Sequence, residues 1–331
     1  MVVLSSTASN TFMLYLEVVG SKYCLLVTNY IYPWQDSPMR QPAEEFLTIR
    51  AFGAPAIVIA LAAQGAFRGF KDTKTPLYAI GKCSHFILPS RYLIASILFW
   101  KLNGEVSLAD PHIDGGKFLQ YLKSGGLLIA RTSSVLLPMT LGTSMAARQG
   151  PVLMAGHQIC VQVWLTISLL TDALAIAGQA LLAGYYSQGN YQEAQQVIYR
   201  VLQVGLVMGI GLAAILFLGF GVIVRLFTAD AEVLKIAWSG ILFVAGSQPV
   251  NAIAFVLDGL YYGVSDFEYA AYSMVVAALI SSAFLLFSAP VFGLPGVWTG
   301  LFLFMSLRVV AGSWRLGTRN GPWIKIWTER D

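Results

Sequence analysis

The sequence predicts an all-α, polytopic membrane protein whose spans enclose very few charged side chains. Two observations support this prediction. Of the 331 residues, 56% are hydrophobic and only 11% are charged, whereas a soluble domain carries about 25% charged residues. The apolar residues also gather into segments long enough to cross a bilayer core of about 30 Å. A large soluble protein with an apolar core does not explain segments of this length.

Seven segments are clear span candidates, because each holds about 20 predominantly apolar residues. In chain order they are 48–67, 125–146, 153–182, 197–224, 236–262, 268–290 and 294–312. Leu77–Leu102 is a weak eighth span, since polar and helix-breaking residues interrupt it: Lys82, His85, Pro89 and Arg91. The connections are short and polar, so no soluble domain is expected between the spans.

Charge, cysteine content and motifs exclude several functions. The net charge of +4 is spread out, without the basic tract of a nucleic-acid-binding protein. Cys24, Cys83 and Cys160 show neither a disulfide framework nor metal-ligand spacing. The sequence has no His-Glu-x-x-His, Gly-x-Ser-x-Gly or P-loop motif. We therefore expect no enzyme activity, metal or cofactor, and any transport must be driven by an ion gradient.

An internal repeat organises the chain. At a constant offset of 194 residues, Ala51, Pro55, Ala60, Gly65, Gly69 and Asp72 match Ala245, Pro249, Ala254, Gly259, Gly263 and Asp266. Transporter folds are often built from such repeats. Downstream, Trp100-Lys-Leu matches Trp314-Arg-Leu at an offset of 214, so the first half is shorter by about one helix. The sidedness of the basic loop Arg68–Thr75 and the basic tail also requires one more crossing. We expect the chain to be incomplete.

Three stretches, Phe46–Tyr78, Ala155–Gln179 and Gly246–Gly263, resemble the multidrug and toxic compound extrusion (MATE) transporters. They are most similar to the branch with plant citrate exporters, plastid members and bacterial DNA-damage-inducible relatives. The resemblance implies a bundle of twelve helices in two lobes. The implied division is 1–45, an atypical N-terminal segment; 46–102, a partial first lobe with the fourth helix and a damaged fifth and sixth; 103–123, a linker; 124–316, an intact second lobe of six helices; and 317–331, a tail.

The resemblance also implies a function. A MATE-like chain exports small organic molecules by alternating access, in exchange for H⁺ or Na⁺, and needs no other cofactor. The substrates implied are organic anions such as citrate or xenobiotic compounds, and the membrane is the plastid envelope or the plasma membrane. The short first lobe favours an alternative for this chain, a truncated or alternatively spliced form that does not transport and is inactive or pairs with a full-length partner as a regulator.

One polar seam runs along span 153–182. Steps of four and three residues place Gln158, Gln162, Leu165, Leu169, Asp172, Ile176 and Gln179 on one helix face. A charge inside a span is costly and usually functional, so Asp172 is a candidate for proton or cation coupling. Gln158, Gln162 and Gln179 are candidate substrate-cavity residues. We expect this seam to face the bundle interior or a wet cavity; the structural alternative is interhelical hydrogen bonding.

A second seam lies in span 236–262, where Gln248, Asn251, Phe255, Asp258 and Tyr262 step by three and four residues. Pro249 interrupts the helix there and frees a backbone carbonyl. A carboxyl group withdrawn from water can load and release a proton near neutral pH, so Asp258 is the second coupling candidate. Gln248, Asn251 and Tyr262 are further cavity candidates. Some relatives carry an acid where Asn251 aligns; here the acid lies seven residues later on the same face.

Arg131 in span 125–146 can balance Asp172 or Asp258, or bind an anionic substrate such as citrate by bidentate hydrogen bonds. A permanent pair with Asp258 is the structural alternative. His157 lies at a span end, where a solvated histidine is expected. The Gly-x-x-x-Gly pairs of the spans are expected to allow close helix packing: Gly65/Gly69, Gly205/Gly209, Gly259/Gly263 and Gly296/Gly300. Asp72 and Asp266 are expected to cap a helix or form a gating contact.

Overall fold

The computed structural model describes residues 89–105 and 115–328, with isolated residues between 56 and 78. The predictions for segment 1–45, most of span 48–67, and Gly65, Gly69 and Asp72 lie outside the described residues. The chain divides into two compact units, Met1–Ile129 and Ala130–Asp331, which meet within one long helix. Every element that the structure describes is a helix, as the fold class predicts.

The first unit contains α5 (Pro89–Glu105), which covers the clean apolar end of the weak predicted span. The buried side chains of α5, Ala95 and Leu98, belong to a small apolar cluster with Ala60, Ala63 and Phe67. Its exposed residues are also largely apolar, and Trp100 is 76% exposed.

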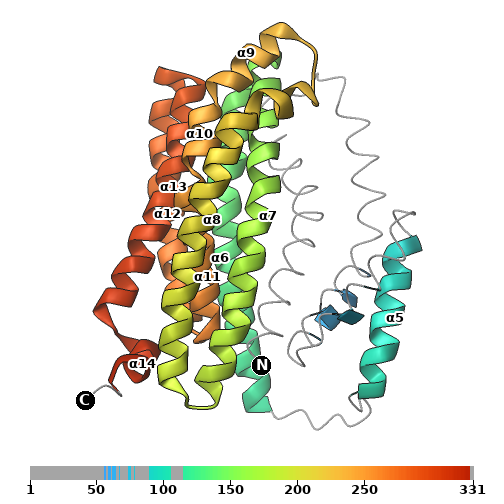
Figure 1. The fold of residues 1–331 in the computed structure, drawn as a ribbon, viewed down its shortest axis with the longest axis vertical. Helices are drawn as coiled ribbons and strands as arrows, with labels where there is room; N and C mark the ends of the chain where they lie inside the picture. The colour runs from blue at the N-terminus through green and yellow to red at the C-terminus, as the bar shows by residue number, and fades with distance from the viewer. Residues whose placement is uncertain are drawn as a thin grey trace. The chain divides into compact units, whose positions relative to one another are not determined.

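The second unit is a helical bundle (Figure 1). Its elements are α6 (Gly115–Ala147, which begins in the first unit), α7 (Pro151–Ser187), α8 (Tyr191–Arg225), α9 (Ala231–Ser239), α10 (Ile241–Gly246), α11 (Gln248–Gly263), α12 (Phe267–Phe292), α13 (Leu294–Thr318), the 3₁₀ turn η1 (Gly321–Trp323) and α14 (Ile324–Thr328). Helix α11 packs against α7, α8 and α13, and α12 packs against α13. The central position of α11 brings its side chains close to several other helices.

Tight turns built on glycine and proline join these long helices. Gly150 has φ 114°, and Pro151 starts α7. Gly293 has φ 65° and alone separates α12 from α13, whose first turn contains Pro295. Only glycine adopts such φ values freely, and proline is favoured in a first helical turn. These turns let each helix follow its predecessor antiparallel with almost no connecting chain.

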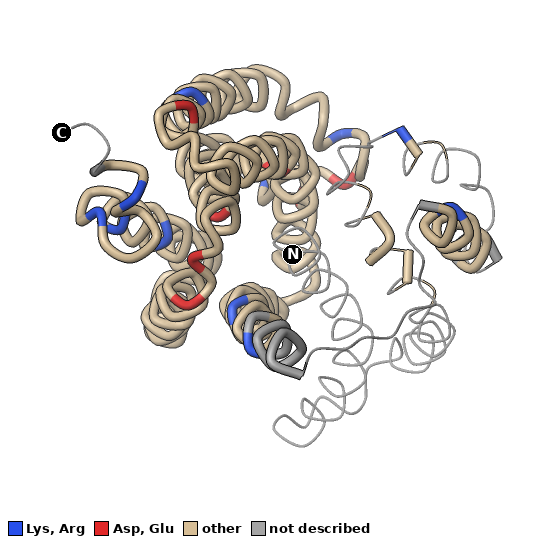
Figure 2. The backbone as a smooth tube through the Cα atoms, turned by 90° about the horizontal axis from the view of Figure 1, so that it is seen from below, with Lys and Arg blue, Asp and Glu red and all other residues tan. Residues whose placement is uncertain are grey.

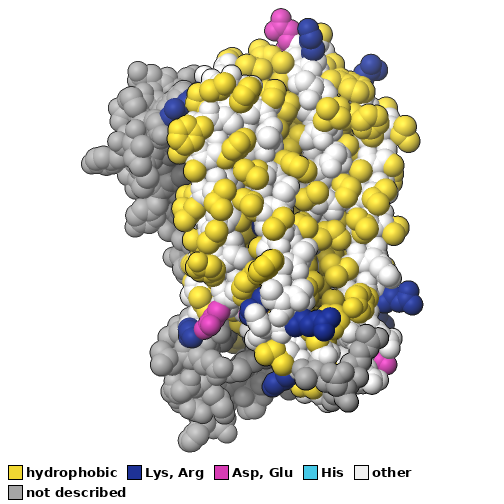
Figure 3. All heavy atoms as spheres, turned by 90° about the vertical axis from the view of Figure 1, so that its left-hand side faces the viewer, with side chains coloured by type: hydrophobic (Ala, Val, Ile, Leu, Met, Phe, Trp, Pro, Cys, Tyr) yellow, Lys and Arg dark blue, Asp and Glu magenta, His cyan; other side chains and the backbone are white. Residues whose placement is uncertain are grey.

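Four described helices are long and apolar enough to cross a membrane: α7, α8, α12 and α13. The bent pair Ala231–Gly246 and Gln248–Gly263 raises the number to five in the described part of the chain. Helix α6 contains the predicted span 125–146 but is not among them. Figure 3 shows the face where α12 and α13 run: hydrophobic side chains cover its middle, and charged side chains lie toward its ends. Such a band is typical of a surface that faces lipid.

The predicted span 236–262 is a broken one, because the structure divides it into α9, α10 and α11. The segments on either side of Ser247 are bent by 47°. Pro249 has no N–H to continue the helical hydrogen bonds, so the bend falls where the sequence predicted an interruption. Gly240 ends α9, and glycine weakens a helix interior. The buried polar residues Gln248 and Asn251 lie directly after this break, inside the bundle.

The glycine pairs of α8, α11 and α13 allow close packing, as predicted. A Cβ atom at Gly209 of α8 would lie 2.8 Å from the Cα atom of Pro249 and 2.9 Å from the Cβ atom of Ala252. A Cβ atom at Gly263 of α11 would lie 2.9 Å from the Leu182 side chain of α7. Real Cβ atoms do not approach so closely, so these glycines set how near α11 lies to α8 and α7.

We expect Gly209→Ala to destabilise the bundle by about 1–3 kcal/mol, because the added methyl group meets the α11 backbone. Gly211→Ala on the same helix is the matched control, since nothing lies within 4 Å of a Cβ atom there. Thermal unfolding of the purified variants in detergent measures the effect. Equal melting temperatures for the two variants would contradict this account of the packing.

Candidate functional site

The centre of the candidate site is Asp258 of α11, a carboxylate that is only 8% exposed. Its Oδ2 atom accepts from the Nη2 group of Arg308 on α13 and forms an ion pair with Nη2 of Arg131 on α6. Two guanidinium groups from different helices therefore share one oxygen of one buried acid. The sequence left open whether Arg131 balances Asp172 or Asp258; the structure pairs it with Asp258.

Aromatic side chains hold both guanidinium groups. Arg131 lies over the ring of Tyr262, with 5.1 Å between Cζ and the ring centroid. The Cζ atom of Arg308 lies over the rings of Phe255 and Phe304, at 5.3 and 5.6 Å from their centroids. Contacts of this kind attract a cation to the face of the ring. The arginines are therefore positioned by contacts that do not depend on Asp258.

The two arginines still have unused hydrogen-bond donors. The Nε atoms of Arg131 and Arg308 are buried and have no hydrogen-bond partner among the described residues. Their side chains are only 12% and 5% exposed. A buried donor without a partner costs free energy, so each is a place where a bound acceptor would gain a hydrogen bond.

Sequence reasoning missed Arg308. It lies within predicted span 294–312, and the rule that marked Arg131 as functional applies to it equally. A search for seams along single helices does not find it, because no other predicted site residue lies on that helix. The structure makes it one of the two partners of Asp258.

Only some of the polar residues predicted on one face of α7 lie near Asp258 or in the bundle interior. Asp172 is half-buried and contributes to the electrostatic environment of Arg131 and Tyr262. Gln179 is buried, whereas Gln158 and Gln162 are exposed. These two glutamines therefore do not lie in the packed core, which Val163 and Trp164 of the same helix face instead; that they line a wet cavity stays a prediction.

Gln248 and Asn251 lie at the break before α11 and are completely buried. The Gln248 amide donates to the Val244 carbonyl over 2.7 Å, and the Asn251 amide donates to Ser247 Oγ over 3.2 Å. Trp164 of α7 also donates to Ser247 Oγ, over 3.2 Å. The two side-chain carbonyl oxygens have no hydrogen-bond partner among the described residues. These residues join α7 to the break.

His157 differs from the sequence expectation of a solvated residue. It is completely buried in α7, and its Nδ1 atom accepts from Trp298 Nε1 over 3.2 Å. A ring nitrogen that accepts is unprotonated, so the imidazole is held in its neutral form by this bond. The α7 helix extends beyond the start of the predicted span, to Pro151, which places His157 inside the packed bundle.

Asp266 forms a separate cluster near the end of α11. It pairs with Arg315 of α13, with Nε–Oδ2 and Nη2–Oδ1 distances of 2.8 and 3.2 Å, and accepts from Trp323 Nε1 over 2.9 Å. Asp266 precedes α12 but shows no side-chain cap hydrogen bond. Asp266 therefore binds the segment after α13 to the bundle through Trp323. It does not act as the expected helix cap, and the expected gating contact stays a prediction.

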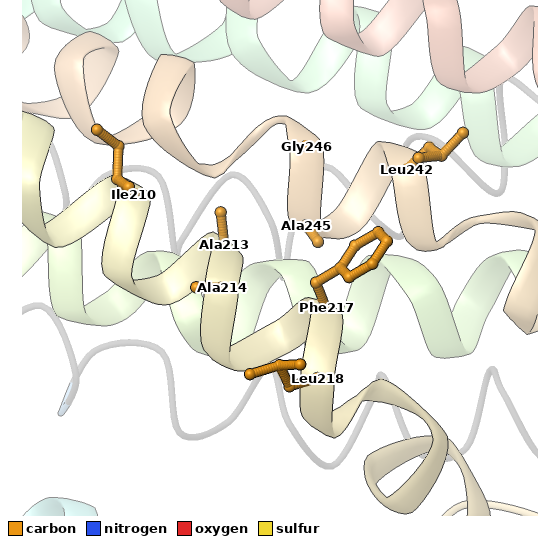
Figure 4. A pocket seen from close by; sticks show the side chains of 8 residues that line it. All are labelled: Ile210, Ala213, Ala214, Phe217, Leu218, Leu242, Ala245 and Gly246. Atoms are coloured by element: carbon orange, nitrogen blue, oxygen red, sulfur yellow. The ribbon is translucent and has the colours of Figure 1, made fainter.

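A groove of about 500 Å³ lies between α8 and α10 and is a poor candidate for the site. Figure 4 shows its lining: Ile210, Ala213, Ala214, Phe217, Leu218, Leu242, Ala245 and Gly246. Every one of these residues is apolar, so the groove offers no side chain that could orient a charged molecule. Figure 2 shows how few Lys, Arg, Asp and Glu positions lie along the described helices, which makes the Asp258 cluster the more informative feature.

Comparisons with known proteins identify the family. The MatE family model matches residues 129–287. Protein DETOXIFICATION 44, chloroplastic, of Arabidopsis thaliana is 62% identical over 315 residues, which are 88% of this chain. The chain belongs to the MATE family. Protein DETOXIFICATION 45, chloroplastic, of the same plant is 50% identical over 309 residues.

The MATE fold is also found by structural comparison. The crystal structure of the eukaryotic MATE transporter AtDTX14 matches with a TM-score of 0.75 at 15% identity, over 99% of this chain and 81% of that chain. The sequence alignments cover 60% of the length of DETOXIFICATION 44 and 55% of the length of DETOXIFICATION 45. The chain thus spans less than two thirds of these MATE relatives. The resemblance read from the sequence motifs is confirmed.

Within this MATE bundle, we expect Asp258→Asn to lower the melting temperature more than Arg308→Gln does. The first change leaves two buried guanidinium groups facing each other, and losing one partner of a buried ion pair costs about 3–5 kcal/mol. The second change leaves Asp258 paired with Arg131. Thermal unfolding in detergent at neutral pH compares the variants. A smaller loss for Asp258→Asn would show that the shared carboxylate does not balance both arginines.

Proposed function

We propose that this MATE chain acts in the secondary active export of organic anions across a membrane, coupled to protons and operating by alternating access. The observation that carries the proposal is the Asp258 carboxylate held between Arg131 and Arg308. All three lie well inside their helices, away from the ends. Charged groups at such positions commonly mark substrate and ion pathways.

The charges favour an anionic substrate over a cationic one. Two guanidinium groups meet one carboxylate, and their Nε donors lack partners among the described residues. An arginine binds a carboxylate through two parallel hydrogen bonds, so a polycarboxylate such as citrate suits the pair. A drug-like cation would be repelled by the net positive charge of the two arginines and one carboxylate. The half-buried Asp172 of α7 offsets part of this positive charge.

The partners of Asp258 also favour H⁺ over Na⁺ as the coupling ion. Sodium needs several oxygen ligands around it, whereas the groups that contact this carboxylate among the described residues are cationic nitrogens. A proton needs only the carboxylate itself. Two lobes that rock around a central site would then convert protonation into access from one side or the other. The names of the two chloroplastic relatives support a plastid membrane as the location.

The experiment is transport by purified protein in liposomes. We expect radiolabelled citrate to cross the membrane when a pH gradient is imposed, and Arg308→Gln or Arg131→Gln to reduce the initial rate at least about tenfold, the effect of losing one charge-assisted contact of 1.4 kcal/mol or more. Asp266→Asn is the matched control, because it breaks another Asp–Arg pair of the same bundle. DETOXIFICATION 44 serves as the full-length comparison.

Two results would contradict the proposal. Citrate flux that ignores the pH gradient would exclude proton coupling. Equal losses for Asp266→Asn and the two arginine variants would show that the charge cluster matters only for folding. Flux in DETOXIFICATION 44 but not in this chain would support the alternative of a non-transporting form.

A further inference from the structure

We propose that the end of α8 next to α9 binds an anionic membrane lipid, with one acyl chain in the apolar groove between α8 and α10 and the headgroup at Arg225 and Lys235. This surface is separate from the Asp258 cluster, and its ligand is independent of the transported substrate. Three features support the site: the lining of the groove, the order of the charges above it, and a tryptophan between the two.

The groove has the chemistry of a site for a hydrocarbon chain. Four small residues line it together with four larger ones: Ala213, Ala214, Ala245 and Gly246 with Ile210, Phe217, Leu218 and Leu242 (Figure 4). Each of the four larger residues is more than half exposed, and α8 is long and apolar enough to cross a membrane. Sites that orient a polar molecule carry a few placed polar groups, and none of these lining residues is polar. In a bilayer the groove therefore suits an acyl chain.

The groove also lies at the depth of an acyl chain in one leaflet. No charged residue lies between Arg200 and Arg225 of α8, a stretch of about 37 Å at 1.5 Å per residue. Along the helix axis, Leu218 lies about 10 Å from Arg225 and Ile210 about 22 Å from it. The groove therefore falls mainly in the leaflet nearest Arg225, below the level of the headgroups.

Two basic side chains lie above the groove, one on each of the helices that form it. Arg225 is seven residues after Leu218 in α8, and Lys235 is seven residues before Leu242 in the arm Ala231–Gly246 of the broken span. Seven residues make nearly two full helical turns, so each base shares a helix face with a residue that lines the groove. Both bases are exposed, and neither forms an ion pair with another described residue.

The acids at this end of the bundle lie farther from the groove than the bases do. Asp230 caps α9, where its Oδ1 atom accepts from the backbone N–H group of Glu232 over 2.8 Å. Glu232 lies one turn before Lys235, on the side away from the groove. Along both helices the charge nearest to the groove is therefore positive. A negatively charged headgroup above the chain would contact Arg225 and Lys235 first.

Trp238 lies between the bases and the groove and packs α9 against α8. Its ring meets Phe220 edge-on, with 6.1 Å between the centroids, and a Cβ atom at Gly221 would lie 2.7 Å from the indole. The residue is nevertheless 47% exposed. It follows Lys235 by three residues and precedes Leu242 by four. Tryptophan is enriched at the level of the lipid headgroups, so Trp238 marks the boundary between headgroup and chain.

The two parts of the site contribute differently to binding. A bilayer is as apolar as the groove, so the chain gains only packing contacts there. The headgroup adds an electrostatic attraction to the two bases, which a lipid without net charge does not have. The groove therefore decides where a lipid binds, and Arg225 and Lys235 decide which kind of lipid it is.

Native mass spectrometry of the full chain tests the headgroup site. The chain in detergent is mixed with equal amounts of phosphatidylglycerol and phosphatidylcholine that carry the same acyl chains, and the ratio of the two lipids in the one-lipid complex is measured. We expect phosphatidylglycerol to be bound preferentially, and Arg225→Gln and Lys235→Gln each to reduce this preference about fivefold. Arg200→Gln is the matched control, because Arg200 is an exposed base at the other end of α8; it should keep the preference.

Two glycines test the groove itself. Gly246 lines the groove and Gly211 of α8 does not, and nothing lies within 4 Å of a Cβ atom built at either position. We expect Gly246→Leu to weaken binding of both lipids about fivefold, the effect of losing about ten atom contacts of the chain. Gly211→Leu should bind both lipids as the unmodified chain does. Thermal unfolding shows whether the variants fold, and Ala214→Leu, at another exposed residue of the groove, is the second variant.

Any of four results overturns the proposal. Equal binding of the two lipids by the unmodified chain, or a loss of preference in Arg200→Gln as large as in Arg225→Gln and Lys235→Gln, shows that this end of α8 does not select an anionic lipid. Unchanged binding in both Gly246→Leu and Ala214→Leu excludes the groove as the site of the chain. A dimer that Gly246→Leu dissociates assigns the groove to a second copy of the protein instead.

Discussion

Asp258 of α11 is the carboxylate that two arginines from other helices share, and much of the bundle is arranged so that this contact can exist. Burying two cations is costly unless they are paired. Arg131 comes from the middle of α6 and Arg308 from the second half of α13, so the acid on α11 connects three helices at once. Because both guanidinium groups contact the same carboxylate, a change at Asp258 would alter the environment of Arg131 and Arg308 together.

The packing around α11 makes that connection possible. Glycines on α8 and α11 let the helices approach until a single methyl group would clash. The bend of 47° at Ser247 gives α11 a direction different from that of α9 and α10. The buried amides of Gln248 and Asn251 follow at once, and Asp258 comes two turns later on the same side. The close packing of α11 therefore holds Asp258 where both arginines can contact it.

The sequence predicted the parts of this arrangement that depend on one helix at a time. Helical spacing placed Asp258 in a seam with Gln248 and Asn251, and all three are buried. Pro249 marked the break. Arg131 was predicted as a counter-ion, but only the tertiary structure shows that it pairs with Asp258 and not with Asp172 alone. The domain boundaries and the coupling and cavity roles predicted for these residues remain predictions.

Other features were missed or placed wrongly because they depend on contacts between helices. Arg308 lies 50 positions after Asp258, and spacing along one helix gives no information on such a pair. Periodicity groups residues on a face of α7 but does not say which neighbour covers that face, so Gln158 and Gln162 are exposed although Gln179 is buried. His157 was assigned to water because the apolar run began nearby; Trp298, from a distant helix, buries it and binds it.

A double-mutant cycle on Asp258 and Arg308 tests the central claim, that two arginines depend on one shared carboxylate, most directly. Thermal unfolding in detergent compares Asp258→Asn, Arg308→Gln and the double variant with the unmodified chain. The account predicts that Arg308→Gln costs less stability in the Asp258→Asn background than in the unmodified chain, because it then removes a buried cation that has lost its carboxylate. Equal costs in the two backgrounds would contradict the account, because the stability contributions of the two side chains would then be independent.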